Sequence, residues 1–167
     1  MRCMKTSTLQ SSEIRDRLRS LIEHEPEWLE RITDAPQIHL AVLVEPFLEY
    51  LLVGKKTVES RFSINRVAPF EEVQSDDVIL LKRSGGPVVG LALVGHTEYF
   101  HLMPKTWSRV RSFSRQICAD AAFWKSRRNK RYASLMHIAD IIAVEPFAVN
   151  KTDRRAWVVL DHVGSLL

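Results

Sequence analysis

Residues 77–94, DVILLKRSGGPVVGLALV, contain two β-prone runs on either side of Gly85 and Gly86. Both glycines can take positive φ, so the segment is a strong β-hairpin signal. The chain also has four further β-prone runs: HLAVLV at 39–44, TVESRF at 57–62, YASLMHIADIIAV at 132–144 and AWVVLDHV at 156–163. The helical sequence between these runs is irregular and gives no regular βαβ alternation. We therefore predict an α+β fold, a small mixed β-barrel with inserted helices.

The first 36 residues have a helical pattern of their own. Ser11 or Ser12 can cap a helix, and Pro26 fits the first turn of a second one that ends before Thr33. The first helix has one apolar face, made of Ile14, Leu18, Leu21 and Ile22. We predict an N-terminal helical extension at 1–36, and a barrel domain at 37–167.

Three helical insertions are predicted inside the barrel domain. Pro46 and Gly54 stand where a short helix would begin and stop. A further helical segment begins near Pro104, and Asp120 can cap another short helix. Cys118 falls where this segment would point it into the core, so we expect a buried thiol.

Composition limits the class of protein. With 46% hydrophobic and 26% charged residues, the 167-residue chain is typical of a soluble globular protein. The longest apolar stretch, residues 40–53, is interrupted by Glu45, Pro46 and Glu49 and cannot supply the ~20 apolar residues of a spanning helix. The first residues contain no apolar core of a secretory signal, so we expect a cytoplasmic protein without a membrane partner.

Nothing in the sequence predicts a metal or a cofactor. The two cysteines, Cys3 and Cys118, form no CxxC pair, and the six histidines are scattered without an HExxH motif. The net charge of +4 instead favours a polyanionic partner. Basic residues cluster at 125–131, KSRRNKR, and at 151–155, KTDRR.

These clusters supply candidate phosphate contacts. Cations beside an aromatic ring can neutralise a backbone and stack a base, which single-stranded nucleic acid requires. The candidates are Arg128 and Arg131 with Tyr132, Arg154 and Arg155, and Lys82 and Arg83 before the hairpin turn. A solvated helix end or strand face remains the alternative interpretation for them. Trp157 is expected in the core.

Residues 54–61, GKKTVESR, form the densest group of ionisable side chains between two apolar runs. In a strand, Glu59 and Arg61 share one face, while Val58 and Phe62 share the other. Lys56 joins the first pair only if the chain bends just after Gly54. The three charged groups then form either a solvated face of little energetic value or the polar floor of a cleft.

This string resembles the GxKxxExR signature of the ASCH domain (activating signal cointegrator homology), with Gly54, Lys56, Glu59 and Arg61 in its four positions. The resemblance covers about residues 38–160, and one departure is Asp76-Asp77 where many relatives have Gly-Asp. ASCH domains are β-barrels related to the RNA-binding PUA domains. The resemblance therefore implies a cleft beside the barrel, floored by these side chains and suited to RNA or a nucleotide.

Some small ASCH proteins are amidohydrolases that deacetylate N4-acetylcytidine with the motif lysine, a threonine and a later glutamate. Lys56 matches that lysine, Glu59 stands at the position of the threonine, and no residue matches the later glutamate. Others are associated with ribonuclease activity, which Lys56 and Glu59 could support by charge stabilisation and proton transfer. We expect binding of RNA, single-stranded nucleic acid or a nucleotide-like molecule. The alternatives are a hydrolase acting on such a ligand and a protein-interaction module that uses the N-terminal helices.

Overall fold

The computed structural model describes residues 11–149, 151 and 153–162. The helices and strands alternate irregularly along this part of the chain, as the sequence predicts. In order they are α1 (Ser11–Leu21), α2 (Pro26–Asp34), β1 (Gln37–Leu43), α3 (Phe47–Leu52), β2 (Val58–Ser63), β3 (Val78–Arg83), β4 (Val88–His101), α4 (Pro104–Arg111), α5 (Ser114–Ile117), α6 (Ala121–Ser126), β5 (Tyr132–Phe147) and β6 (Trp157–His162).

The six strands form one mixed sheet in the order β2-β5-β4-β3-β1-β6. Only β1 and β3 are parallel, and all other neighbouring strands are antiparallel. The long strands β4 and β5 run the length of the molecule, and register shifts at Val88, Leu93 and Val94 let them twist together. Because β2 and β6 stay at the two edges, the sheet is an open half-barrel. The α+β class is confirmed.

The predicted hairpin is present between β3 and β4, with Leu80 opposite Leu91. Of its two glycines, Gly85 takes positive φ, at 70°. Because β1 is parallel to β3 and antiparallel to β6, the end of β3 and the following turn lie at the same end of the sheet as the start of β6. That end carries part of the site described below.

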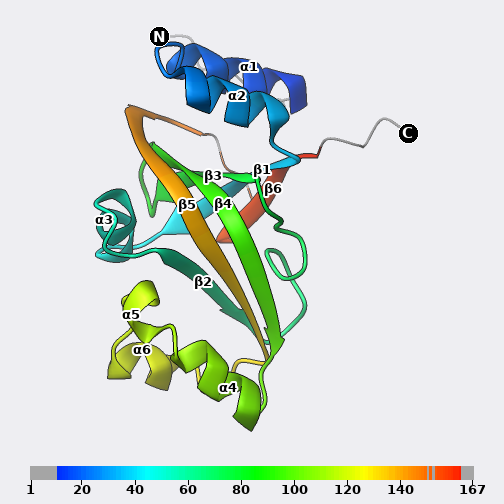
Figure 1. Cartoon of the computed structure of the whole chain (residues 1–167), viewed down its shortest axis with the longest axis vertical. Helices are drawn as coiled ribbons and strands as arrows, with labels where there is room; N and C mark the ends of the chain where they lie inside the picture. Colours follow the sequence, from blue (N-terminus) through cyan, green and yellow to red (C-terminus); the bar gives the residue numbers. More distant parts are fainter. Residues whose placement is uncertain (1–10, 150, 152, 163–167) are drawn as a thin grey trace.

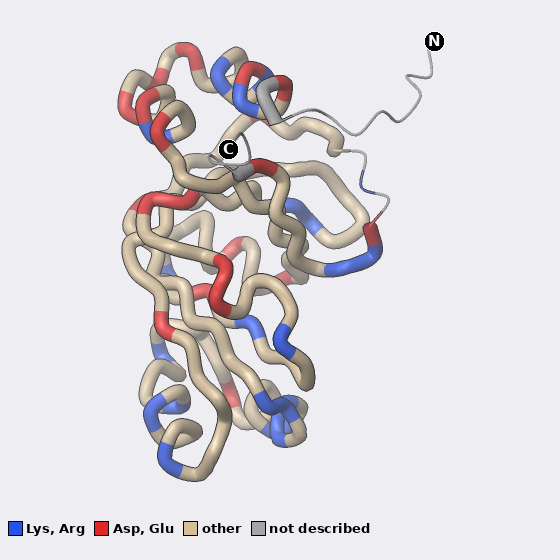
Figure 2. Tube along the Cα trace, turned by 90° about the vertical axis from the view of Figure 1, so that its right-hand side faces the viewer, with Lys and Arg blue, Asp and Glu red and all other residues tan. Residues whose placement is uncertain are grey.

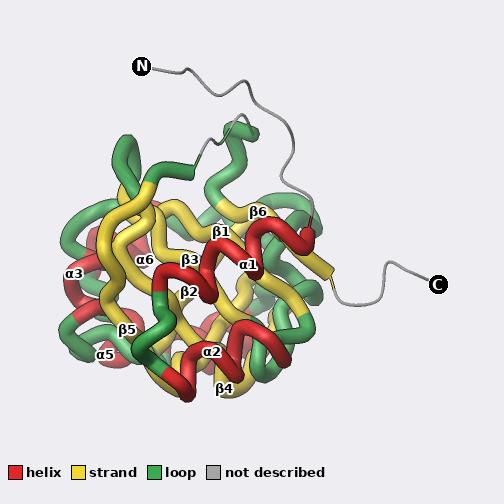
Figure 3. The backbone as a smooth tube through the Cα atoms, turned by 90° about the horizontal axis from the view of Figure 1, so that it is seen from above, coloured by secondary structure: helices red, strands yellow, loops and turns green. Residues whose placement is uncertain are grey.

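Helices cover the two ends of the sheet. Figure 1 shows α1 and α2 at one end and α4 to α6 at the other, and Figure 3 shows α1 and α2 lying over the strands. The apolar face of α1 and α2 shares one buried cluster with the strands, formed by Leu18, Ile22, Trp28, Ile32, Ala35, Ile38, Leu40, Val78, Leu80, Val88 and Leu91. A second cluster fills the middle of the half-barrel, and a third lies under α4 to α6.

A buried ion pair joins the N-terminal helices to the sheet. Arg15 of α1 pairs with Asp161 of β6, and its guanidinium also donates to the carbonyls of Ile32 and Ala35 at 2.7 and 2.9 Å. One arginine thus satisfies carbonyls at the end of α2 and a carboxylate on the edge strand. The boundary at residue 36 remains a prediction, but α1 and α2 clearly contribute to the core.

Two predicted details were wrong. Leu21 is 37% exposed, because α1 ends there and its apolar face is carried by Ile14, Leu18 and Ile22. Cys118 is half-buried instead of lying in the core. It follows the four-residue helix α5 with φ of 62°, a left-handed conformation that turns its side chain away, and its thiol lies 3.6 Å from the carbonyl of Lys55.

Candidate nucleic-acid interface

The corner between α3 and β2 places Lys56. Gly54, with φ of 76°, ends α3, and the backbone N–H of Lys56 then donates to the carbonyl of Tyr50 at 2.8 Å. The next residue, Thr57, donates to Gln116 of α5 at 3.0 Å. Lys56 therefore lies in a fixed turn before the strand, so strand alternation does not apply to it. This is the bend that brings it to the face of Glu59.

Lys56, Glu59 and Arg61 form a connected ionic group. Lys56 Nζ lies 2.8 Å from Glu59 Oε2, and Arg61 Nε donates to Glu59 Oε1 at 2.8 Å. Lys56 and Glu59 are only 4% and 3% exposed, so the solvated-face interpretation is excluded. Burial raises the pKa of Glu59, but the charges and hydrogen bonds of Lys56 and Arg61 outweigh it, and the pKa of Glu59 lies below its ordinary value.

Further contacts orient the Arg61 guanidinium. Its Nη2 donates to the carbonyl of Val42 at 2.9 Å, and its Cζ lies 5.2 Å from the ring centre of Trp157. Trp157 is buried, as predicted, and its Nε1 donates to His39 Nδ1 at 3.2 Å. Because His39 Nδ1 accepts, its Nε2 carries the proton and donates to Asp77 Oδ2 at 2.7 Å. A buried chain of hydrogen bonds through His39 and Asp77 thus fixes the Trp157 ring, which the Arg61 guanidinium contacts.

These groups line a hollow of about 550 Å³, here called the motif cleft. Cations and aromatic rings meet in it: the Arg127 guanidinium lies 3.5 Å from the ring centre of Phe123, and Lys56 Nζ lies 4.8 Å from that of Phe47. Its charged and aromatic lining consists of Lys56, Glu59, Arg61, Arg127, Lys130, Phe47, Phe62 and Phe123. Ser60 also lines it, and its Oγ is buried without a hydrogen-bond partner among the described residues.

The charge of Arg127 interacts with those of Glu59 and Arg61. Burial lowers the pKa of Arg127, Glu59 raises it and Arg61 lowers it further, so the net direction is downward. An arginine guanidinium keeps its proton in proteins at neutral pH, so this lowering leaves Arg127 charged. The cleft therefore holds four cations against one carboxylate, Glu59.

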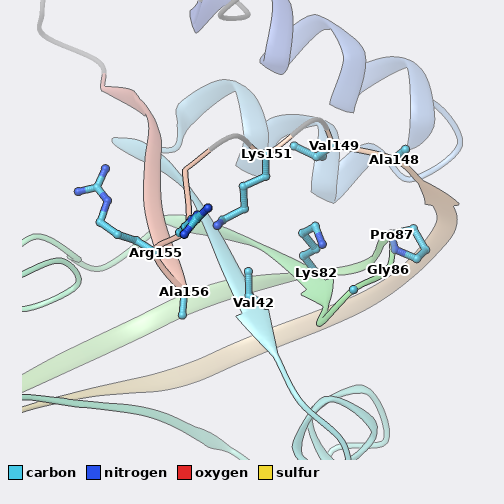
Figure 4. Close-up of a pocket in the computed structure, with 11 residues that line it drawn as sticks. Val42, Lys82, Gly86, Pro87, Ala148, Val149, Lys151, Arg155 and Ala156 are labelled. Carbon is cyan, nitrogen blue, oxygen red and sulfur yellow. The ribbon is translucent and has the colours of Figure 1, made fainter. Parts of the chain in front are cut away.

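A second hollow of about 630 Å³, here called the basic hollow, is shown in Figure 4. The two share Val42 and Ala156 as lining residues. Figure 4 shows Lys82, Lys151 and Arg155 around this hollow, and Arg154 lines it too. Three of the sequence-predicted contacts, Lys82, Arg154 and Arg155, are thereby brought together.

Four other predicted contacts line neither hollow. Arg83 pairs with Glu45, whereas Arg128 and Arg131 are exposed on the helical end of the molecule. Tyr132 is half-buried, because its ring centre lies 5.0 Å from that of Phe70 and 5.2 Å from that of His101. Their role in binding stays a prediction.

Helix α6 supplies a wall of the motif cleft that was not predicted from the sequence. Phe123 and Arg127 are four residues apart, so they share one face of this helical turn. That spacing could have selected Arg127 from the basic run at 125–131. The whole segment 104–131 carries nine Lys and Arg residues and one carboxylate, Asp120. Figure 2 shows that Lys and Arg dominate this end of the molecule.

One group of potential metal ligands occurs among the described residues: His96, Glu98 and His137, with donor atoms within 4.8 Å of one another. The carboxylate already accepts from His137 at 2.7 Å and from Arg109 at 3.1 Å. The imidazole planes of His96 and His137 are stacked, with an angle of 13° between them. Since a metal must lie in the plane of each ligating ring, this arrangement does not present two imidazoles to one ion.

No helix within the described ranges is long and apolar enough to cross a membrane. The cytoplasmic location stays a prediction. No model of a known protein family matches the chain, and no curated protein does so either.

Solved structures of an ASCH protein from Zymomonas mobilis are similar to this chain. One superposes with a TM-score of 0.52 at 19% identity, covering 66% of this chain and 73% of that one. A serine-to-alanine variant of that protein gives a TM-score of 0.59 at 18% identity, covering 75% and 89%. At such identities the likeness concerns the fold. This chain therefore has the α+β half-barrel fold of the ASCH domain, as the resemblance of residues 54–61 implied.

Proposed function

We propose that this chain is an RNA-binding or nucleotide-binding domain that holds its ligand in the motif cleft. The proposal depends on one observation: cationic side chains and aromatic rings line the same hollow. The cations are Arg61, Arg127 and Lys130, and the rings are those of Phe47, Phe62 and Phe123. Cations can neutralise a phosphate, and an aromatic ring can stack on a base.

The charge balance within the cleft supports a phosphate ligand. Glu59 is held ionised by its two partners, and it offsets one of the four cations. Three positive charges therefore remain without a carboxylate in the cleft. Arg61 keeps its Nη1 without a hydrogen bond among the described residues, because Nε and Nη2 are used by Glu59 and Val42. A guanidinium fixed on two sides can donate its remaining N–H groups to a phosphate without a large loss of side-chain entropy.

A hydrolase acting on the same ligand is the second candidate. The convergence of the Lys56 ammonium and the Glu59 carboxylate on the motif cleft favours it. Two features favour binding alone. Glu59 has a lowered pKa, which makes it a poor general acid at neutral pH, and it is the one carboxylate in the cleft lining. A protein-interaction role of α1 and α2 has less support, because their apolar face is used in the core.

The proposal is tested by titrating fluorescently labelled single-stranded RNA with the protein at several salt concentrations. Affinity should fall as salt rises, because phosphate contacts release counterions. A chain that fails to bind RNA and mononucleotides even at low salt would not be a nucleotide-binding domain. To separate binding from hydrolysis, the RNA is recovered after incubation and its length and base composition are analysed.

A further inference from the structure

The basic hollow is built by loops that converge at one end of the sheet. Lys82 comes from the end of β3, and the turn around Gly85 follows it. Lys151, Arg154 and Arg155 come from the connection between β5 and β6. Figure 4 shows Lys82 and Lys151, which come from different segments, beside the same space.

The charges of this hollow are largely free of neutralising carboxylates. Its lining contains four cations and no acidic residue. Lys82 Nζ donates to the backbone carbonyl of Arg83 at 3.2 Å, and Lys151 Nζ donates to that of Asp153. Arg154 has no ion pair with any residue that the structure describes. Carbonyl contacts leave the ammonium charges in place.

Arg155 is the exception, since Asp153 holds it. Its Nε lies 3.0 and 2.9 Å from the two carboxylate oxygens, and these hydrogen bonds lower the pKa of Asp153 to about 2. The pair keeps the guanidinium beside the hollow in one orientation. Asp153 also interacts with the charge of Lys151, so Lys82 and Arg154 are the two cations of this lining without a carboxylate partner among the described residues.

The two hollows adjoin at Val42 and Ala156, which line both and are here called the Val42 ridge. Val42, which lines both, donates its N–H to the carbonyl of Ala156 at 2.9 Å. Its own carbonyl accepts from Arg61 at 2.9 Å. A ligand bound at Arg61 in the motif cleft is thus beside the wall of the basic hollow.

The two hollows differ in chemistry. Aromatic rings line the motif cleft, whereas the basic hollow is lined by cations, glycine, proline and small aliphatic residues, without an aromatic ring. The first suits a base with its phosphate, and the second suits phosphates alone. A polymer of nucleotides has both parts in succession, because each base that can stack is flanked by phosphates.

We infer that the ligand is a single-stranded oligonucleotide that crosses the Val42 ridge, with one nucleotide in the motif cleft and phosphates of its neighbours in the basic hollow. This inference rests on the proposed function and narrows it from any nucleotide to a strand. The basic hollow offers no aromatic ring on which a base can stack, so we expect its cations to bind phosphates and to add little dependence on base sequence.

The test compares the affinities of a mononucleotide, a dinucleotide, a tetranucleotide and an octanucleotide of RNA. The variant Lys82→Ala/Arg154→Ala removes two cations of the basic hollow. The variant Lys105→Ala/Arg128→Ala removes two exposed cations that line neither hollow and serves as the matched control. Melting curves establish that each variant is folded, and Arg154→Ala alone replaces the first variant if Lys82→Ala unfolds.

Wild-type affinity should rise with the length of the RNA. The slope of log affinity against log salt concentration should become more negative by about 0.7 for each added phosphate contact. Lys82→Ala/Arg154→Ala should bind the octanucleotide on the order of tenfold more weakly, with mononucleotide affinity unchanged. If the mononucleotide binds and the longer oligonucleotides bind no more tightly, this inference is overturned and the proposed function stands. Equal losses in the two double variants, or equally tight binding of polyglutamate, would also overturn it. If neither mononucleotide nor octanucleotide binds, the proposed function itself fails.

Discussion

The Lys56 ammonium lies 2.8 Å from Glu59 Oε2, and both side chains are almost completely buried. An ion pair removed from water in this way is costly to break, because the remaining charge has neither solvent nor a partner. Arg61, on the other side of the same carboxylate, is more exposed and faces the motif cleft. Glu59 therefore has a structural role toward Lys56 and an orienting role toward Arg61.

Glu59→Gln should destabilise the protein by about 3 kcal/mol at neutral pH, because it removes the charge between Lys56 and Arg61. The pKa of Glu59 is lowered in the fold, so its stabilising effect is complete above its ordinary value of 4.5 and is lost as the pH falls through the folded value. The difference in unfolding free energy between wild type and variant should thus narrow below that pH. Urea unfolding at a series of pH values measures it, and a difference that stays constant into acid would contradict the account.

Lys56→Met tests the other member of the pair. The substitution keeps much of the side-chain volume but leaves Glu59 with one partner, so we expect a loss of roughly 3 kcal/mol. Lys55→Met is the matched control, since Lys55 is the preceding residue and is exposed. It should change stability by less than about 0.5 kcal/mol. Equal melting temperatures for the two variants would show that the Lys56 pair adds nothing to stability.

If the chain is a hydrolase, Lys56→Met should abolish turnover and retain much of the ligand affinity. If Lys56 only supports the cleft, affinity should fall with stability. Single-turnover measurements at saturating protein, performed well below the melting temperature of the variant, separate the two outcomes.

Asp77→Asn should be more harmful than Asp76→Asn, although the two residues are neighbours. Asp77 is fully buried and accepts from His39, from the backbone N–H of Gln37 and from that of Gln74. An amide in its place turns a donor toward a donor, which should cost about 2 kcal/mol. Asp76 is exposed with φ of 70°, a conformation that asparagine tolerates well. Thermal melts of both variants provide the comparison, and similar losses would refute the assigned role of Asp77.

Deletion of residues 1–36 should leave a domain with a cooperative but less stable unfolding transition. The loss follows from uncovering the apolar cluster around Leu40 and Leu80, and from leaving Asp161 without Arg15. Asp161→Asn should therefore restore part of the stability of the truncated protein while destabilising the full chain. A truncated protein without a cooperative transition would place α1 and α2 inside the barrel domain and make the boundary wrong.

Local signals explain how much of the fold could be predicted. The β3–β4 hairpin follows from a glycine turn between two β-prone runs, and the end of α3 from Gly54. The Glu59–Arg61 pair follows from strand alternation. Each of these features depends on residues close together in the chain.

The remaining features depend on packing between distant segments. No local pattern indicates that α6 lies beside β2, so Phe123 and Arg127 were not recognised as the second wall of the cleft. The burial of Lys56 also escaped prediction, because it depends on the turn that Tyr50 and Gln116 fix. The packing of Tyr132 could not be predicted either, because its contact with Phe70 joins β5 to a distant loop.

The adjacent arginines Arg127 and Arg128 offer the most direct test of the central claim, since only the first lines the motif cleft. The measurement is the affinity of each alanine variant for a labelled mononucleotide and a short single-stranded RNA at fixed low salt. Arg127→Ala should weaken binding of both ligands by about tenfold, roughly the 1.4 kcal/mol expected for one lost charged hydrogen bond. Arg128→Ala removes the same charge from the neighbouring position, and it should bind both ligands nearly as tightly as wild type does. Equal affinities for the two variants, whether both reduced or both unchanged, would contradict the assignment of the motif cleft as the binding site.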